Sequence, residues 1–130
     1  MAATNPIYRD FSLAFGIHPI RKDIATLVNV DAVKRSVINL ILTDHYDRPF
    51  HPEIGCDVHR LLFENITPVT QAYVQRSIIN VLGNFEPRVS VVNVNVTPDP
   101  DNNGINISIA FTIVNQPGTA TVDLFLERIR

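Results

Sequence analysis

Residues 89–126 read VSVVNVNVTPDPDNNGINISIAFTIVNQPGTATVDLFL. Two runs within this stretch carry apolar residues at every second position, which is typical of strands that bury one face. Asn103-Gly104 is a hairpin signal before the first run, and residues 115–118 form a second turn signal between the runs. We therefore predict a three-stranded antiparallel meander with one face packed on helices. The alternating apolar positions are Ile105, Ile107, Ile109, Phe111 and Ile113, followed by Ala120, Val122, Leu124 and Leu126.

The first strand of the meander changes phase part of the way along. Val89 and Val91 lie on one phase of the alternation, whereas Val92, Val94 and Val96 lie on the other. A shift of one residue moves the side chains that follow to the opposite face of a sheet. We therefore predict a β-bulge near Val91.

Upstream of the meander, apolar residues recur at steps of three and four. This spacing places them on one face of a helix that begins near Asn29 or Asp31, either of which can cap it. The helix should end within residues 43–47. Its apolar face consists of Val30, Val33, Val37, Leu40 and Ile41, widened by Ile38 and Leu42.

A second long helix is marked at both ends. Thr67 is a good N-cap residue, and Pro68 occupies the first helical position, where its missing N–H group costs nothing. We predict that this helix runs to Leu82 and that Gly83 ends it in a left-handed conformation.

Between these helices the chain is rich in proline. Residues 48–57 predict an ordered loop, because Pro49 and Pro52 prevent regular structure and Gly55 permits a tight turn. Asp57 then looks like the cap of a short helix that carries Val58, Leu61, Leu62 and Phe63.

The N-terminal segment lacks a clear periodic pattern. Phe11, Leu13 and Phe15 alternate and fit either a short strand or a docking arm. We assign residues 1–28 to an irregular N-terminal arm and residues 29–130 to a single domain. The fold class is α+β, with helices packed on the C-terminal meander.

Composition excludes several classes of protein. The chain has 130 residues, 45% of them hydrophobic and 18% charged, which fits one globular domain rather than a disordered chain. The net charge of −2 and the lack of a basic stripe argue against a nucleic-acid partner. Apolar runs are too short for a membrane span. Cys56 is the single cysteine, so no internal disulfide forms, which fits assembly in a reducing cytoplasm.

The triplet Glu86-Pro87-Arg88 stands where the second long helix hands over to the meander. Pro87 prevents further helix. Its charged neighbours have two interpretations. In the first, they have only a structural role at the junction or pair with neighbours in the same chain. In the second, they form charge-assisted hydrogen bonds with a partner, for which the planar fork of arginine is suited.

The residue types present raise three chemical alternatives: a metal site, a thiol nucleophile and a pair of catalytic carboxylates. His45, His51, Cys56 and His59 lie close together, but their spacing matches no standard zinc pattern. Cys56 near His59 suggests a thiol nucleophile only if a base and an orienting group are in reach, and a lone cysteine is more often a small buried residue. We therefore expect no metal, no cofactor and no catalytic residue.

A pair of acidic residues is the remaining catalytic option. A glycosidase needs two carboxyl groups across a sugar-binding cleft, one of them with a raised pKa. The chain has no tryptophan, and its three tyrosines are scattered, so a sugar-stacking platform is not evident. The candidate residues are Glu53, Glu64 and Glu86.

Several motifs, taken in order, resemble the baseplate wedge and sheath-initiator family of contractile phage tails. This family includes the small baseplate wedge proteins of T4-like phages and is related to a component of the type VI secretion baseplate. The resemblance runs from about Val33 to Val96, and the meander continues it to the C-terminus. The motifs are Arg48-Pro49-Phe50, Pro52-Glu53-Ile54-Gly55-Cys56-Asp57, Leu62-Phe63-Glu64-Asn65, Thr67-Pro68 and Glu86-Pro87-Arg88.

The resemblance implies a structural role rather than catalysis. Family members sit at the centre of the baseplate wedge and present a platform for the first ring of sheath subunits, which link by exchanging strands. It implies that Glu86, Pro87 and Arg88 bind a partner. The implied partners are other wedge proteins and the tail sheath protein, in a symmetric assembly of many copies. We expect no nucleic-acid or membrane partner. The implied location is the tail baseplate of the virion, assembled in the host cytoplasm.

Two other functions stay open from the sequence. One is a peptidoglycan-degrading, lysozyme-like enzyme, because similar proteins have been described in that way. The other is a generic adaptor domain outside phage tails. An unpaired edge of the meander supports the structural interpretation independently, since such an edge is a template for a strand from another chain.

Overall fold

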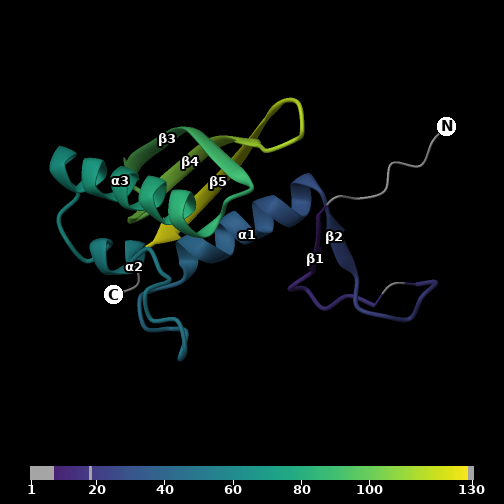
Figure 1. Cartoon of the computed structure of the whole chain (residues 1–130). Coiled ribbons are helices and arrows are strands. Elements are labelled where there is room, and N and C mark those ends of the chain that lie inside the picture. Colours follow the sequence, from purple (N-terminus) through teal and green to yellow (C-terminus); the bar gives the residue numbers. More distant parts are fainter. Residues whose placement is uncertain (1–7, 18, 129–130) are drawn as a thin grey trace.

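The computed structural model describes residues 8–17 and 19–128. Figure 1 shows the arrangement of helices and strands along the chain. The elements are β1 (Arg9–Phe11), β2 (Thr26–Val28), α1 (Val30–Leu42), α2 (Val58–Leu61), α3 (Pro68–Phe85), β3 (Val89–Asp99), β4 (Gly104–Ile113) and β5 (Thr119–Glu127).

The predicted meander is confirmed. Strands β3, β4 and β5 form a three-stranded antiparallel sheet in that order, so the α+β class is confirmed as well. The register of β3 against β4 shifts between Val91 and Asn93, which confirms the predicted bulge. Val92 is the extra residue, and it is 63% exposed because the bulge turns it away from the core.

Strand β3 continues further than the polar sequence indicated. It includes residues 97–99, although Pro98 cannot donate a hydrogen bond. Pro98 lies opposite Ile105 of β4. Because β3 is an outer strand of the sheet, this proline is tolerated with its nitrogen on the open side.

Helix α1 begins at Val30, as predicted, but its cap works differently from the prediction. Asn29 occupies the cap position with a positive φ of 51°, and its side chain does not cap the helix. The Oδ1 atom of Asn29 instead accepts a hydrogen bond from the backbone N–H of Tyr8 at 3.5 Å, and the Asn29 N–H donates to the carbonyl of Tyr8 at 2.8 Å. The start of α1 is therefore tied to the N-terminal segment.

The predicted start of helix α3 is confirmed, whereas its predicted end is wrong. Thr67 caps it, with Oγ1 accepting from the N–H of Thr70 at 3.3 Å, and Pro68 is the first helical residue. The helix passes through Gly83 and ends at Phe85. Gly83 therefore does not end the helix, which stops before Pro87, a residue that restricts the backbone of the residue preceding it.

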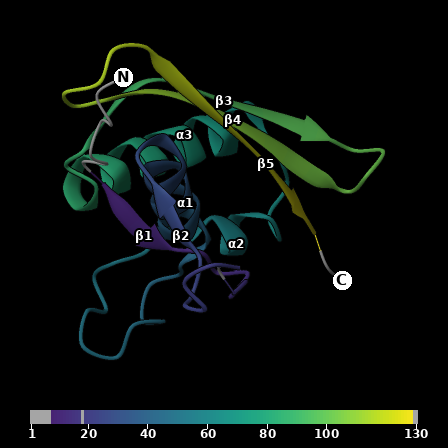
Figure 2. The same ribbon diagram turned by 90° about the vertical axis from the view of Figure 1, so that its right-hand side faces the viewer.

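The core lies between the sheet and the helices. Figure 2 shows α1 and α3 beneath one face of the meander. The alternating residues of β4 point into this core, and Phe111 is the largest fully buried side chain. Along the described residues, no helix is both long and apolar enough to cross a membrane. The core cluster includes Val33, Val37, Ile41, Val74, Ile78, Leu82, Ile105, Ile107, Ile109, Phe111 and Val122.

The N-terminal segment, for which the sequence allowed either a short strand or a docking arm, contains two short strands. Strands β1 and β2 pair antiparallel, and an isolated bridge between Ile17 and Ile24 extends the ribbon. We call residues 8–17 and 19–28 the arm. Figure 1 shows it beside the start of α1 and away from the sheet. Most apolar residues of the arm are exposed, among them Phe11, Phe15, Ile17 and Ile20.

Candidate docking site

The junction between α3 and β3 contains a buried ion pair. Glu86 is only 3% exposed. The Nε of Arg88 donates to Oε1 of Glu86 at 2.6 Å, and a terminal nitrogen of Arg88 donates to Oε2 at 2.9 Å. This two-point contact fixes the plane of the guanidinium group as well as its position.

Helix α1 supplies a third bond to the same carboxylate. The hydroxyl of Ser36 donates to Oε2 of Glu86. Burial by itself raises the pKa of Glu86, but the hydrogen bonds from Arg88 and Ser36 outweigh it and hold the pKa below its ordinary value. Glu86 is therefore a buried carboxylate whose charge is satisfied within the chain.

Arg88 has a second face, which is turned toward the arm. Its side chain is 28% exposed, and its guanidinium carbon lies 5.4 Å from the centre of the Tyr8 ring. The hydrogen bond to Glu86 raises the pKa of Arg88, and the nearby carboxylate of Asp10 contributes in the same direction. One arginine thus contacts the core junction and the arm together.

Backbone bonds bring the first turn of the meander into this cluster. The N–H of Val114 donates to the carbonyl of Arg88 at 2.9 Å. The hydroxyl of Tyr8 donates to the carbonyl of Val114 at 3.3 Å. The end of α3, both neighbouring strands and the arm therefore meet at Arg88.

The three predicted site residues have unequal access to a partner. Glu86 is enclosed by its own chain, whereas Pro87 is exposed and Arg88 keeps part of its surface open. The in-chain pairing that the sequence allowed is present. A partner contact by this triplet remains a prediction, and it would involve Pro87 and Arg88 directly and Glu86 only through its hold on Arg88.

The two ends of the proline-rich loop after α1 are joined by a contact between His45 and Asp57. The N–H and Nδ1 of His45 lie 3.1 Å and 2.8 Å from the two carboxylate oxygens of Asp57. Asp57 has a left-handed backbone and does not cap α2, so its predicted role as a helix cap is wrong. A Cβ at Gly55 would lie 2.5 Å from backbone atoms of Asp44 and His45, at the other end of the loop. Only glycine allows the two chain segments to approach so closely.

The histidines and the cysteine of this region do not form a reactive centre. Within the described ranges, no group of three or more His, Cys, Asp or Glu residues is arranged to hold a metal. Cys56 is fully buried, and its sulfur lies 3.7 Å from the hydroxyl of Ser77. Burial raises the pKa of this thiol to about 11, which keeps it protonated and unreactive.

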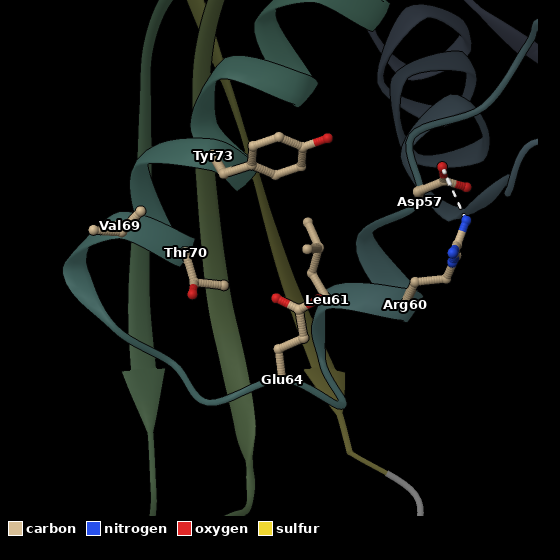
Figure 3. Close-up of a pocket in the computed structure, with 7 residues that line it drawn as sticks. All are labelled: Asp57, Arg60, Leu61, Glu64, Val69, Thr70 and Tyr73. Atoms are coloured by element: carbon tan, nitrogen blue, oxygen red, sulfur yellow. Dashed lines mark ion pairs between the residues drawn. The ribbon is translucent and has the colours of Figure 1, made fainter.

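A hollow of about 410 Å³ opens between α2 and the start of α3. Figure 3 shows Tyr73 of α3 above Leu61, with the ion pair of Asp57 and Arg60 at one side. Glu64 lines it from the connection between the helices. Its lining includes Asp57 of the second ordered motif and Glu64 of the third.

The three acidic residues weighed as a glycosidase pair do not share a site. Glu86 lies under α1, Glu64 lines the hollow beside α2, and Glu53 lines a different groove along α3. A hydrogen bond from its own backbone lowers the pKa of Glu53, and the pKa of Glu86 is lowered as well. A general acid needs the opposite shift.

Two contributors to the junction were not identified from the sequence. Ser36 sits three residues after Val33, on the stripe that α1 buries, so a polar residue inside an apolar stripe was the available signal. Tyr8 had no local signal, because its partners Arg88 and Val114 are distant in the chain.

These features are typical of a structural assembly component, whose chemistry serves to hold surfaces in place. The chain belongs to the family of baseplate wedge protein gp25, whose family model matches residues 20–118. It is 35% identical over 117 residues to baseplate wedge protein gp25 of Enterobacteria phage T4, covering 90% of this chain and 88% of the phage protein. The resemblance inferred from the ordered motifs is thereby confirmed.

Solved structures share the fold at lower identity. The anti-feeding prophage baseplate contains a chain with a TM-score of 0.65 and 19% identity, covering 95% of this chain and 87% of that one. The pyocin R2 baseplate after contraction gives 0.54 and 20%, covering 85% and 97%. A proposed tail lysozyme from Geobacter sulfurreducens gives 0.68 and 18%, covering 75% and 89%.

Proposed function

We propose that this protein is a structural part of the baseplate wedge that docks on other wedge proteins and starts the sheath by accepting a strand from a sheath subunit. The observation that carries the proposal is the outer edge of β5. Within the described part of the chain, the sheet ends at this strand. A regular unpaired edge offers backbone donors and acceptors to an incoming strand.

The direction of the backbone groups in β5 follows from one hydrogen bond. The N–H of Arg128 donates to the carbonyl of Asn103, on the β4 side. Backbone groups alternate in direction along a strand, so the N–H and C=O groups of the even-numbered residues of β5 point toward β4. The N–H and C=O groups of the odd-numbered residues point toward the open side. The open positions are Thr119, Thr121, Asp123, Phe125 and Glu127.

The opposite edge is less suited to strand addition. Pro98 removes a donor from the outer side of β3, and the bulge at Val92 interrupts its pairing geometry. Strand β5 contains neither proline nor a bulge over its nine residues. This asymmetry supports β5 as the accepting edge.

The junction supports a separate docking surface. Pro87 and the open part of Arg88 lie at the far end of α3 from the hollow beside α2, next to the arm. We infer that this surface contacts other wedge proteins, with many copies of the chain arranged in a symmetric baseplate of the virion that assembles in the host cytoplasm. A catalytic role receives no support from the carboxylates described above.

Proline substitutions on the open side of β5 test the strand-sharing proposal. Thr121→Pro and Phe125→Pro each remove one outward N–H group and leave the bonds to β4 in place, so the isolated protein should stay folded. The matched controls are Thr121→Ala and Phe125→Ala, which change the same side chains and keep the N–H.

The readout is sheath formation on assembled baseplates, counted by electron microscopy, with thermal unfolding recorded for each variant. We expect few or no sheaths with the proline variants and normal sheaths with the alanine variants. Folded proline variants that start full-length sheaths at the normal rate would show that β5 is not the accepting edge.

A further inference from the structure

The arm exposes much of its apolar surface. A two-stranded ribbon is marginally stable by itself in water. Phe11 is 64% exposed and Ile20 is 85% exposed. Something in the body must therefore hold the ribbon in place, and the structure shows where.

The contacts of the first described residues converge on one side chain. The ring of Tyr8 lies over the guanidinium group of Arg88, within the range of a cation–π contact. Asp10, on the half-buried face of β1, adds its negative charge near the same group. Tyr8 is further fixed by its hydroxyl bond to Val114 and its backbone bonds to Asn29.

Arginine can serve both neighbours together because its edge and its face are chemically distinct. The edge nitrogens bond the carboxylate of Glu86, while the flat face receives the ring of Tyr8. A lysine ammonium at this position would keep the charge but would lose the fork and the flat face.

We propose that Tyr8 is a positioning residue, which through Arg88 fixes the direction of the arm relative to the end of α3. The buried carboxylate of Glu86 acts as the anchor, Arg88 as the connector and Tyr8 as the point of attachment. The outer face of the ribbon, formed by Arg9, Phe11, Thr26 and Val28, is thereby held in one orientation relative to Arg88.

Hydrogen exchange of the isolated full chain tests this proposal without any partner. Two reporter amides lie in the arm: the N–H of Ala25, bonded to Gly16, and the N–H of Ser12, bonded to Ala25. Tyr8→Ala should raise their exchange rates about three- to fivefold, which is the loss expected for a partly exposed cation–π contact. Amides of α3 should keep their rates.

Conservative variants separate positioning from general packing. Tyr8→Phe keeps the ring over Arg88 and loses only the bond to Val114, so it should retain most of the protection. Phe11→Ala removes an aromatic ring of the same arm that faces solvent, and it should leave the reporter amides nearly unchanged.

The decisive comparison is a double-variant cycle. In an Arg88→Gln background, which has no cation to place over the ring, Tyr8→Ala should add less exchange than it does in the wild type, because the cation–π contact is already lost and only the bond to Val114 remains to be removed. If the two effects multiply instead, or if Tyr8→Ala leaves the arm amides at their original rates, the proposal is wrong. Because this measurement needs neither sheath nor wedge proteins, its result is independent of the strand-sharing function.

Discussion

The ion pair at the α3–β3 junction makes Arg88→Ala the most informative single substitution. The change removes two hydrogen bonds from a carboxylate that is 3% exposed and leaves Ser36 as its remaining side-chain donor among the described residues. Breaking one side of a buried pair costs about 3–5 kcal/mol. Because the Arg88 side chain is 28% exposed, water can reach part of the vacated space. We therefore expect a loss of about 2–3 kcal/mol in the free energy of unfolding.

This loss corresponds to a melting temperature about 10 °C lower for a domain of this size. Urea unfolding followed by far-ultraviolet circular dichroism measures the free energy, since the chain has no tryptophan for a fluorescence signal. The double variant Glu86→Gln with Arg88→Ala is the control. It removes the buried charge together with its partner, so it should be more stable than Arg88→Ala alone.

Two results would refute the reasoning. One is an Arg88→Ala variant within about 0.5 kcal/mol of the wild type, the range of ordinary surface substitutions. The other is strict additivity of Glu86→Gln and Arg88→Ala, which would mean that the two side chains are not coupled. The expected loss also affects how assembly defects are interpreted. A failure of Arg88→Ala to build tails reports on docking only after its folded fraction has been measured.

Three further outcomes follow from local geometry. The lowered pKa of Glu86 means that its stabilising effect is fully present above the ordinary carboxyl pKa and is lost as pH falls through the lower folded value. Glu86→Gln should therefore flatten the stability profile below about pH 5 in urea titrations at each pH. Cys56, with a pKa of about 11 and no exposure, should resist iodoacetamide at pH 8 in the native protein and react once urea unfolds it; rapid native labelling in mass spectra would contradict the burial. Gly55→Ala should cost about 1–3 kcal/mol because its Cβ meets backbone at 2.5 Å, whereas Gly83→Ala, which meets nothing within 4 Å in the interior of α3, should gain about 0.5–1 kcal/mol; equal unfolding midpoints for both alanine variants would contradict this assignment.

Local patterns predicted the regular elements well. The alternation from Ile105 to Ile113 and the fault at Val91 correspond to β4 and to the bulge of β3. The Thr67-Pro68 pair marks the start of α3 to the residue. These features are decided within a few neighbours by backbone sterics and by the burial of one face, so the sequence carries them directly.

Predictions that depended on a single polar residue were less successful. Asp57 was predicted as a helix cap and Asn29 was one of two candidate caps, but the first pairs with His45 and the second with the backbone of Tyr8. A short polar side chain can satisfy its own helix or a distant group. The choice between them depends on which partner the fold brings near.

The sequence by itself determined the meander, the two long helices, the absence of a standard metal pattern and, through the order of its motifs, the family. Only the tertiary structure decided that Glu86 is buried, that Arg88 joins the core to the arm through Tyr8, and that β5 carries the more regular open edge. The physical reason is distance along the chain. Periodicity and capping act between neighbours, whereas a buried charge takes its partners from segments that are as far apart as residues 8, 36 and 114 and that meet only after folding.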